Sequence, residues 1–203
     1  MIKKVFLYFI GFMTAACSSS SETLPSGLRL RSETESRQVI ESMTRKEEKY
    51  SGLYNTVTLS ATLQTSDVLA ALDELRARQG LWDATKFAEE RQKTLEESRK
   101  KTEIFMSFYT PERKHDNLTK SDTRWQIFLD NGGRRYKASV KRLRQEPAEI
   151  AALFPHHTRF ATPYILTFDV PVTQVETSES KLTVTGPIDS VTLTWGARPP
   201  ATQ

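Results

Sequence analysis

The sequence predicts a mainly β fold with helical additions, in the form of an immunoglobulin-like antiparallel β-sandwich that carries an inserted α-hairpin. Three observations support this prediction. About seven segments alternate apolar and polar residues with the period of two of a half-buried strand, and six of them follow residue 101. An Asn-Gly pair at 131–132, a strong short-range hairpin signal, separates two of these segments. A stretch with helical periodicity at about 66–101 interrupts the strands.

The first clear strand runs from Tyr54 to Leu63. Apolar residues at 57, 59, 61 and 63 alternate there with threonine or serine. The preceding segment, 32–49, is polar, and Val39, Ile40 and Met43 give it a narrow apolar stripe. We therefore expect an N-terminal helix over 32–49 and a sandwich domain over 50–196.

The helical insertion shows start and stop signals for two helices. Ser66-Asp67 offers N-cap chemistry for the first helix, and Gly80 marks its end. The second helix is expected to start at Asp83 and to run to about Lys101, with acid–base pairs four residues apart along it. Both helices lie between strands, which predicts an α-hairpin inserted into the sheets.

The segments around the Asn-Gly pair predict a β-hairpin with a two-residue loop. With Asn131-Gly132 as the loop, Ile127 faces Tyr136, and with Gly132-Gly133 as the loop, Leu129 faces Tyr136. Either loop brings the apolar residues to one face, whereas a three-residue loop would split them. Further strands are expected at 164–170, 182–184 and 191–195, and a short helix is expected at 147–153 with its proline at the first position.

The N-terminus has the parts of an export signal. Lys3 and Lys4 make the start positive, residues 5–13 are apolar, and Thr14-Ala15-Ala16 supplies small residues before Cys17. The apolar run is too short to span a bilayer, which needs about 20 residues. Residues 1–16 are therefore predicted to be a signal peptide.

The segment that ends at Cys17 resembles the type II signal peptides of bacterial lipoproteins, whose lipobox ends in a small residue followed by cysteine. Ala15, Ala16 and Cys17 match this pattern, and Thr14 stands where leucine is usual. The resemblance covers about the first twenty residues. It implies cleavage between Ala16 and Cys17 and attachment of a diacylglyceryl group and an acylated amine to Cys17. The alternative is a plain secretory signal followed by an incidental cysteine.

Cys17 is the only cysteine, so no disulfide can form within the chain. A single free thiol is unusual in an exported protein, and lipidation of Cys17 would account for it. Residues 17–31 contain serine, proline and glycine and are expected to be a flexible tether, and 197–203 a disordered tail. In lipoproteins of this kind a serine after the cysteine accompanies outer-membrane sorting. Ser18 therefore favours a lipid-anchored location in the outer membrane of a bacterial cell envelope.

The motifs point to no catalytic centre, cofactor or metal. The chain has no Gly-x-Ser-x-Gly motif and no glycine-rich phosphate loop. His115, His156 and His157 lack the spacing of zinc ligands and are predicted to be surface loop residues. A Ser-His-Asp set that is assembled in space stays open.

A basic run at 134–144 is the most suggestive patch. Strand alternation places Arg135, Lys137 and Lys141 in one outward row that could meet anionic lipid headgroups, lipopolysaccharide phosphates or an acidic partner. The alternative is a solvated sheet face whose lysines prevent edge pairing. Loss of the signal leaves 27 basic against 25 acidic residues, so nucleic acid is not expected as a partner.

These observations together predict a membrane-anchored, non-enzymatic β-sandwich lipoprotein that binds another envelope component, a protein. One alternative is an envelope hydrolase or carbohydrate-binding enzyme with a spatially assembled site. The other is a binder of anionic lipid or lipopolysaccharide through the basic strand.

Overall fold

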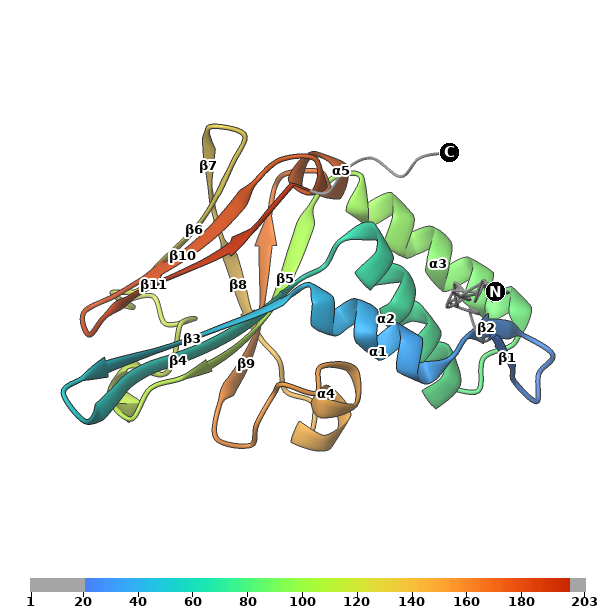
Figure 1. Ribbon diagram of the computed structural model, residues 1–203, viewed down its shortest axis with the longest axis horizontal. Coiled ribbons are helices and arrows are strands. Elements are labelled where there is room, and N and C mark those ends of the chain that lie inside the picture. The colour runs from blue at the N-terminus through green and yellow to red at the C-terminus, as the bar shows by residue number, and fades with distance from the viewer. Residues whose placement is uncertain (1–20, 198–203) are drawn as a thin grey trace, which may run out of the picture.

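The computed structural model describes residues 21–197, most of which lie in two antiparallel sheets and in several helices (Figure 1). The first sheet contains, in order, β3 (Thr44–Ser51), β4 (Tyr54–Leu63), β5 (Thr102–Tyr109), β9 (Thr162–Phe168) and β8 (Ser139–Arg142). The second contains β11 (Ser190–Trp195), β10 (Ser180–Thr185), β6 (Gln126–Asn131) and β7 (Arg134–Lys137). The predicted signal peptide, Cys17 and positions 198–203 of the predicted tail lie outside the described residues.

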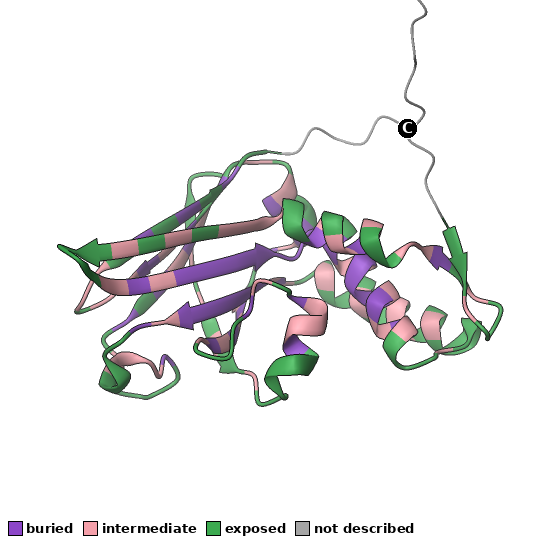
Figure 2. Ribbon diagram, turned by 60° about the horizontal axis from the view of Figure 1, so that its bottom comes forward, coloured by how far each residue is buried: buried purple, intermediate pink, exposed green. Residues whose placement is uncertain are grey.

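The main core lies between the two sheets and is built by the period-two patterns. Alternate residues of β4, β5, β9, β6, β10 and β11 are buried together, among them Leu59, Met106, Leu166, Leu129 and Trp195. Figure 2 shows this burial along the strands. The prediction of a mainly β fold with antiparallel sheets and several helices is confirmed.

The two sheets are joined along both sides. On one side β11 lies beside β3, where Trp195 Nε1 donates to the carbonyl of Met43 at 2.8 Å and Arg45 Nε to that of Thr194 at 3.3 Å. On the other side the chain leaves β7 at Lys137 and enters β8 at Ser139. Only Ala138 separates the two strands, so this segment passes from one sheet to the other.

Three of the helices pack on the outer face of the five-stranded sheet around Phe105. A second core joins Phe105 of β5 to apolar residues of α1 (Glu33–Ser42), α2 (Ser66–Gln79) and α4 (Pro147–Leu153). Helix α3 (Ala84–Ser98) buries no residue fully and packs on α2 through polar contacts. Arg91 and Thr94 of α3 reach the carboxylate of Asp73, which is 1 % exposed, at 3.4 and 3.2 Å. Helices α2 and α3 stand between β4 and β5, where the sequence predicts an α-hairpin. The remaining helical segments of the described residues are the short helix α5 (Val172–Glu176) and the 3-10 turn η1 (Arg113–His115).

The β6–β7 hairpin has the two-residue loop that the sequence predicts. Its loop is Gly132-Gly133, with φ of 55° and 77°, and Leu129 lies opposite Tyr136. Both glycines adopt the left-handed conformation that a two-residue hairpin loop of this kind requires.

Two boundary predictions are wrong. The helix expected over 32–49 ends at Ser42, and Thr44–Ser51 forms β3. β3 is an edge strand, which pairs only with β4, and it carries charged residues on both faces. Its sequence therefore lacks the alternation of apolar and polar residues that would have predicted a strand. The tether expected over 17–31 is replaced from Ser21 onward by a hairpin of β1 (Ser21–Thr23) and β2 (Arg29–Arg31), whose Leu30 is buried. Within residues 21–197, no helix has both the length and the apolar character needed to cross a bilayer.

Candidate functional site: a cationic groove

A groove of about 1300 Å³ runs beside β8, the last strand of the five-stranded sheet. One edge of β8 pairs with β9, and no strand of the described part of the chain pairs with the other. The groove is formed by β8 and the residues that follow it, by the 155–161 loop after α4, and by the loop between β5 and β6. Its lining comprises Asn117, Thr119, Val140, Lys141, Arg142, Leu143, Arg144, Gln145, Pro147, Ile150, His157, Arg159, Ala161 and Pro163.

Four basic residues make this groove positively charged: Lys141, Arg142, Arg144 and Arg159. We call it the cationic groove. No aspartate or glutamate is among the described residues that line it. In the described part of the chain these four side chains form no ion pair, and the Arg159 guanidinium lies 4.8 Å from the centroid of the Phe160 ring. Closely spaced cations without counter-charges concentrate a positive field, so the groove is suited to an anionic ligand.

The 155–161 loop that carries Arg159 is held by packing against the sheet. The Phe154 ring stacks on Phe105 at a centroid distance of 3.9 Å with 5° between the planes. The N–H of His157 donates to the carbonyl of Phe154 at 2.9 Å, and His157 Nδ1 lies 2.9 Å from Ser107 Oγ. These contacts hold the loop on β5, which places Arg159 beside the end of β8.

Another part of the lining, the segment around Asn117, is fixed by Tyr164 of β9. Its hydroxyl donates to the carbonyl of Asp116 at 2.6 Å and accepts from the N–H of Leu118 at 3.1 Å. Burial raises the pKa of Tyr164, so the hydroxyl keeps its proton for this bond at neutral pH. The 116–118 segment is thereby fastened to the sheet, and Asn117 and Thr119 reach the groove from it.

The prediction that all three histidines are surface loop residues is wrong for two of them. His157 is 7 % exposed, and the His156 ring meets the Phe105 and Phe154 rings edge-on at 5.4 and 6.2 Å. Burial, with a smaller contribution from the neighbouring His157, lowers the pKa of His156 to about 4, and burial also lowers the pKa of His157. The positive charge of the groove at neutral pH therefore comes from lysine and arginine. His115 lies in η1, and its Nε2 is 3.8 Å from Glu112.

Ser107 and His157 form the one Ser-His contact among the described residues, and it borders a second hollow of about 560 Å³. A triad needs a carboxylate on the second ring nitrogen and a serine that a substrate can reach. No carboxylate of the described residues bonds His157, and Ser107 is 4 % exposed on the central strand β5. The contact pairs two buried polar groups that would otherwise lack partners.

The three residues of the predicted basic row, Arg135, Lys137 and Lys141, do not lie on one strand. Arg135 and Lys137 lie on β7 and Lys141 on β8, so the row is divided between two sheets. Arg135 is engaged by Asp130, which accepts from its Nε at 2.7 Å and from its Nη2 at 3.0 Å, and this bond lowers the pKa of the Asp130 carboxyl. Of the three residues only Lys141 lines the groove.

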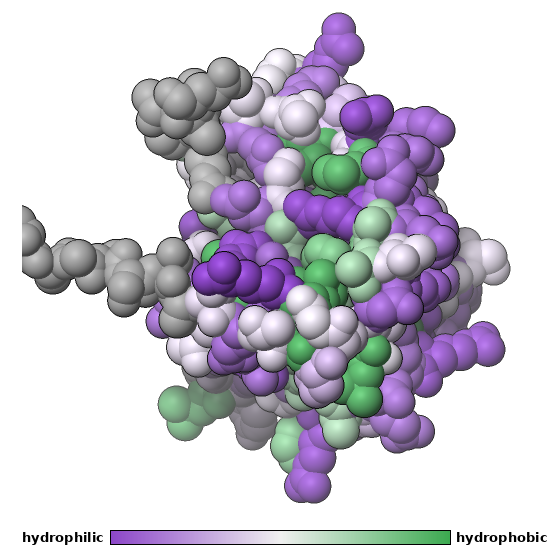
Figure 3. All heavy atoms as spheres, turned by 90° about the vertical axis from the view of Figure 1, so that its right-hand side faces the viewer, coloured by the Kyte–Doolittle hydropathy of each residue, from purple (hydrophilic) through white to green (hydrophobic). Residues whose placement is uncertain are grey.

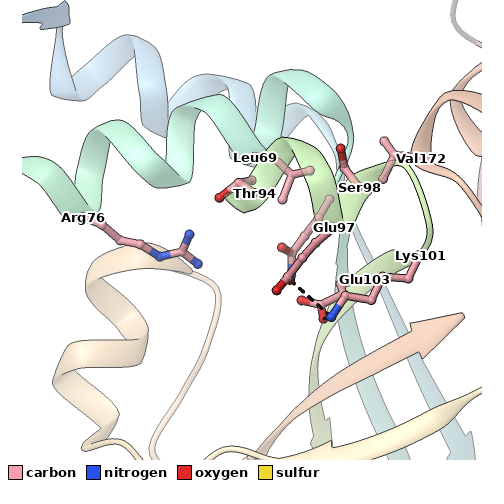
Figure 4. A pocket seen from close by; sticks show the side chains of 9 residues that line it. Leu69, Arg76, Thr94, Glu97, Ser98, Lys101, Glu103 and Val172 are labelled. Carbon is pink, nitrogen blue, oxygen red and sulfur yellow. Dashed lines mark ion pairs between the residues drawn. The ribbon is translucent and has the colours of Figure 1, made fainter. Parts of the chain in front are cut away.

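Another pocket, at the base of the α-hairpin, is too small to compete as a ligand site (Figure 4). Its volume of about 150 Å³ lies well below the roughly 300–1,000 Å³ of small-molecule sites. Lys101 bridges Glu97 and Glu103 there at 3.2 and 3.4 Å, which leaves these charges paired. Among residues 21–197 no group of three or more His, Cys, Asp or Glu side chains is arranged to hold a metal ion.

No protein-family model, curated protein or solved structure matches the chain. The immunoglobulin-like class therefore stays a prediction.

Proposed function

We propose that this chain is a membrane-anchored lipoprotein of the bacterial cell envelope, in which a non-enzymatic, immunoglobulin-like sandwich binds an acidic segment of another envelope protein. The cationic groove carries this proposal, because no aspartate or glutamate of residues 21–197 lines it beside its four cations. The lipid on Cys17 would hold the domain at the membrane, and Ser18 favours the outer membrane.

The size and lining of the groove favour a protein segment over a small molecule. Its volume of about 1300 Å³ exceeds the roughly 300–1,000 Å³ of small-molecule sites. Val140, Leu143 and Ile150 add apolar surface between the cations. The free edge of β8 can accept hydrogen bonds from an added strand, the geometry of β-augmentation. The same cations would repel a second copy of this edge, which gives selectivity for an acidic strand.

The test compares charge reversal inside and outside the groove. A variant with Arg142→Glu, Arg144→Glu and Arg159→Glu should lose the partners that co-purify with the wild-type protein from detergent-solubilised envelopes. The control combines Arg135→Glu with Lys181→Glu, two exposed cations of the four-stranded sheet, and should keep those partners. Equal retention by both variants would contradict the proposal. Loss of binding to phosphatidylglycerol vesicles without any change in protein partners would favour the anionic-lipid alternative.

The hydrolase alternative rests on the Ser107–His157 contact of 2.9 Å. A fluorophosphonate probe, which labels activated serines, tests it directly. Labelling of the wild-type protein that Ser107→Ala abolishes would support an enzyme. We expect no labelling, because Ser107 is buried and no carboxylate of the described residues orients His157.

A further inference from the structure

The β1–β2 hairpin is bound to the C-terminal half of α2 and to the turn that follows it. Glu22 pairs with Arg78 at 2.5 Å, Arg31 pairs with Glu74 at 2.9 Å, and Ser26 Oγ donates to the carbonyl of Trp82 at 2.9 Å. Ser21 is therefore held at the end of the molecule that lies opposite the tip of the β3–β4 hairpin (Figure 1).

Only a short length of chain separates this end from Cys17. Cys17 precedes Ser21 by four residues, and four residues span at most about 14 Å in any conformation. A lipid on Cys17 would keep the α2–α3 turn close to the bilayer. The domain would not hang from a long tether.

The residues exposed at this end are unusual for a surface turn. Leu81 is 71 % exposed and has a φ of 48°, a left-handed conformation in which glycine is the usual residue. The turn closes α2 in the Schellman pattern, with Trp82 N–H donating to Ala77 O at 3.0 Å and Leu81 N–H to Arg78 O at 3.3 Å. A leucine here adds backbone strain and also exposes an apolar side chain, so the stability of the fold gives no reason for it.

The loop between β1 and β2 meets this turn where Ser26 Oγ bonds the carbonyl of Trp82. We call the apolar residues of the loop and the turn, Leu24, Leu28, Leu81 and Trp82, the turn surface. Leu24, Leu28 and Trp82 are half-buried, and Lys86 Nζ lies 5.9 Å from the centroid of the Trp82 ring. Figure 3 looks onto this end of the molecule and shows apolar surface in the middle of the face with hydrophilic residues around it. Tryptophan is enriched at the headgroup level of membrane proteins, and lysine is among the residues that anchor them there.

We propose that the turn surface rests on the lipid bilayer, with the Leu81 side chain among the headgroups and acyl ends. This inference rests on the proposed lipidation of Cys17. It also gives the domain a fixed orientation, because the β3–β4 tip, where Leu53 is 96 % exposed, then points away from the membrane.

Spin labels at the two ends of the full-length lipidated protein test this orientation. Leu81→Cys and Leu53→Cys would each receive a nitroxide, and a lipidated Cys17 has no free thiol to compete for it. Both proteins are reconstituted in vesicles of phosphatidylethanolamine and phosphatidylglycerol. Accessibility to oxygen, which partitions into lipid, is compared with accessibility to a water-soluble nickel chelate. Co-sedimentation with the vesicles is measured first in every sample.

A several-fold higher ratio of oxygen to nickel accessibility at position 81 than at position 53 is the expected result. Trp82 supplies a label-free check, since the other two tryptophans, Trp125 and Trp195, are buried. Brominated lipids should quench part of the wild-type emission, and Trp82→Phe should remove that part. Sedimenting protein with equal ratios at both positions would overturn the orientation and leave the anchor standing. Protein that fails to sediment would overturn the anchor and the orientation together.

Discussion

Acid should destabilise this fold through His156. The Phe105 and Phe154 rings contact the imidazole edge-on, and its pKa falls from 6.5 to about 4 on burial. The folded state therefore disfavours protonation, whereas the unfolded chain takes up the proton near pH 6.5. The contribution to stability is complete above pH 6.5 and is lost as the pH falls toward 4. The difference between the two pKa values corresponds to about 3.4 kcal/mol of unfolding free energy at pH values well below 4. Between pH 7 and pH 4 the free energy of unfolding should fall by about 3 kcal/mol from this cause.

Urea denaturation followed by tryptophan fluorescence measures this loss, because Trp125 and Trp195 are buried in the main core. Carboxylates also titrate in this range, so the wild-type protein is compared with His156→Leu. The variant removes the imidazole, whose buried Nε2 has no hydrogen-bond partner among residues 21–197. It should lose about 3 kcal/mol less than the wild type between pH 7 and pH 4. His115→Gln, outside this cluster, serves as the matched control and should follow the wild type. Parallel curves for the wild type and His156→Leu would refute the reasoning.

Three further changes separate packing from backbone effects. Gly186→Ala would place a Cβ 2.2 Å from Trp125 Cε3 in the core and should cost about 1–3 kcal/mol in urea denaturation, whereas Gly196→Ala, with open space around it, should cost little. Phe154→Ala removes the ring stacked on Phe105 and should lower the free energy of unfolding by about 3–5 kcal/mol in the same assay. A decrease below about 1 kcal/mol would show that the 155–161 loop does not depend on this contact. Leu81→Gly relieves the left-handed leucine and should raise the free energy of unfolding by about 1 kcal/mol, so a lower melting temperature would contradict the assigned strain.

The strands that build the main core could be predicted because burial on one face imposes a period of two. Tyr54–Leu63 was predicted with the bounds that β4 has, and the apolar residues of the 125–140 segment limited the hairpin to two loops. β3 escaped prediction because an edge strand can be polar on both faces. The β1–β2 hairpin escaped because ion pairs to Glu74 and Arg78, more than forty residues away, hold it in place.

The candidate site was predictable only in part. Lys141, Arg142 and Arg144 lie in the basic run, but nothing local indicates that the strand changes sheets at Ala138. Arg159 follows Arg144 by fifteen residues and reaches the groove because α4 and Phe154 dock on Phe105. Burial of His156 and His157 follows from the same docking, which depends on tertiary contacts that no short pattern encodes.

Lipidation of Cys17 is the premise of both the proposed function and the membrane orientation, and labelling with a radioactive fatty acid tests it most directly. The wild-type protein and Cys17→Ser are expressed in bacteria grown with labelled palmitate, and membranes are separated from soluble material. We expect a labelled wild-type protein in the membrane fraction and an unlabelled Cys17→Ser protein that no longer sediments with membranes as the wild type does. If both proteins are unlabelled and equally membrane-bound, the lipid anchor is wrong.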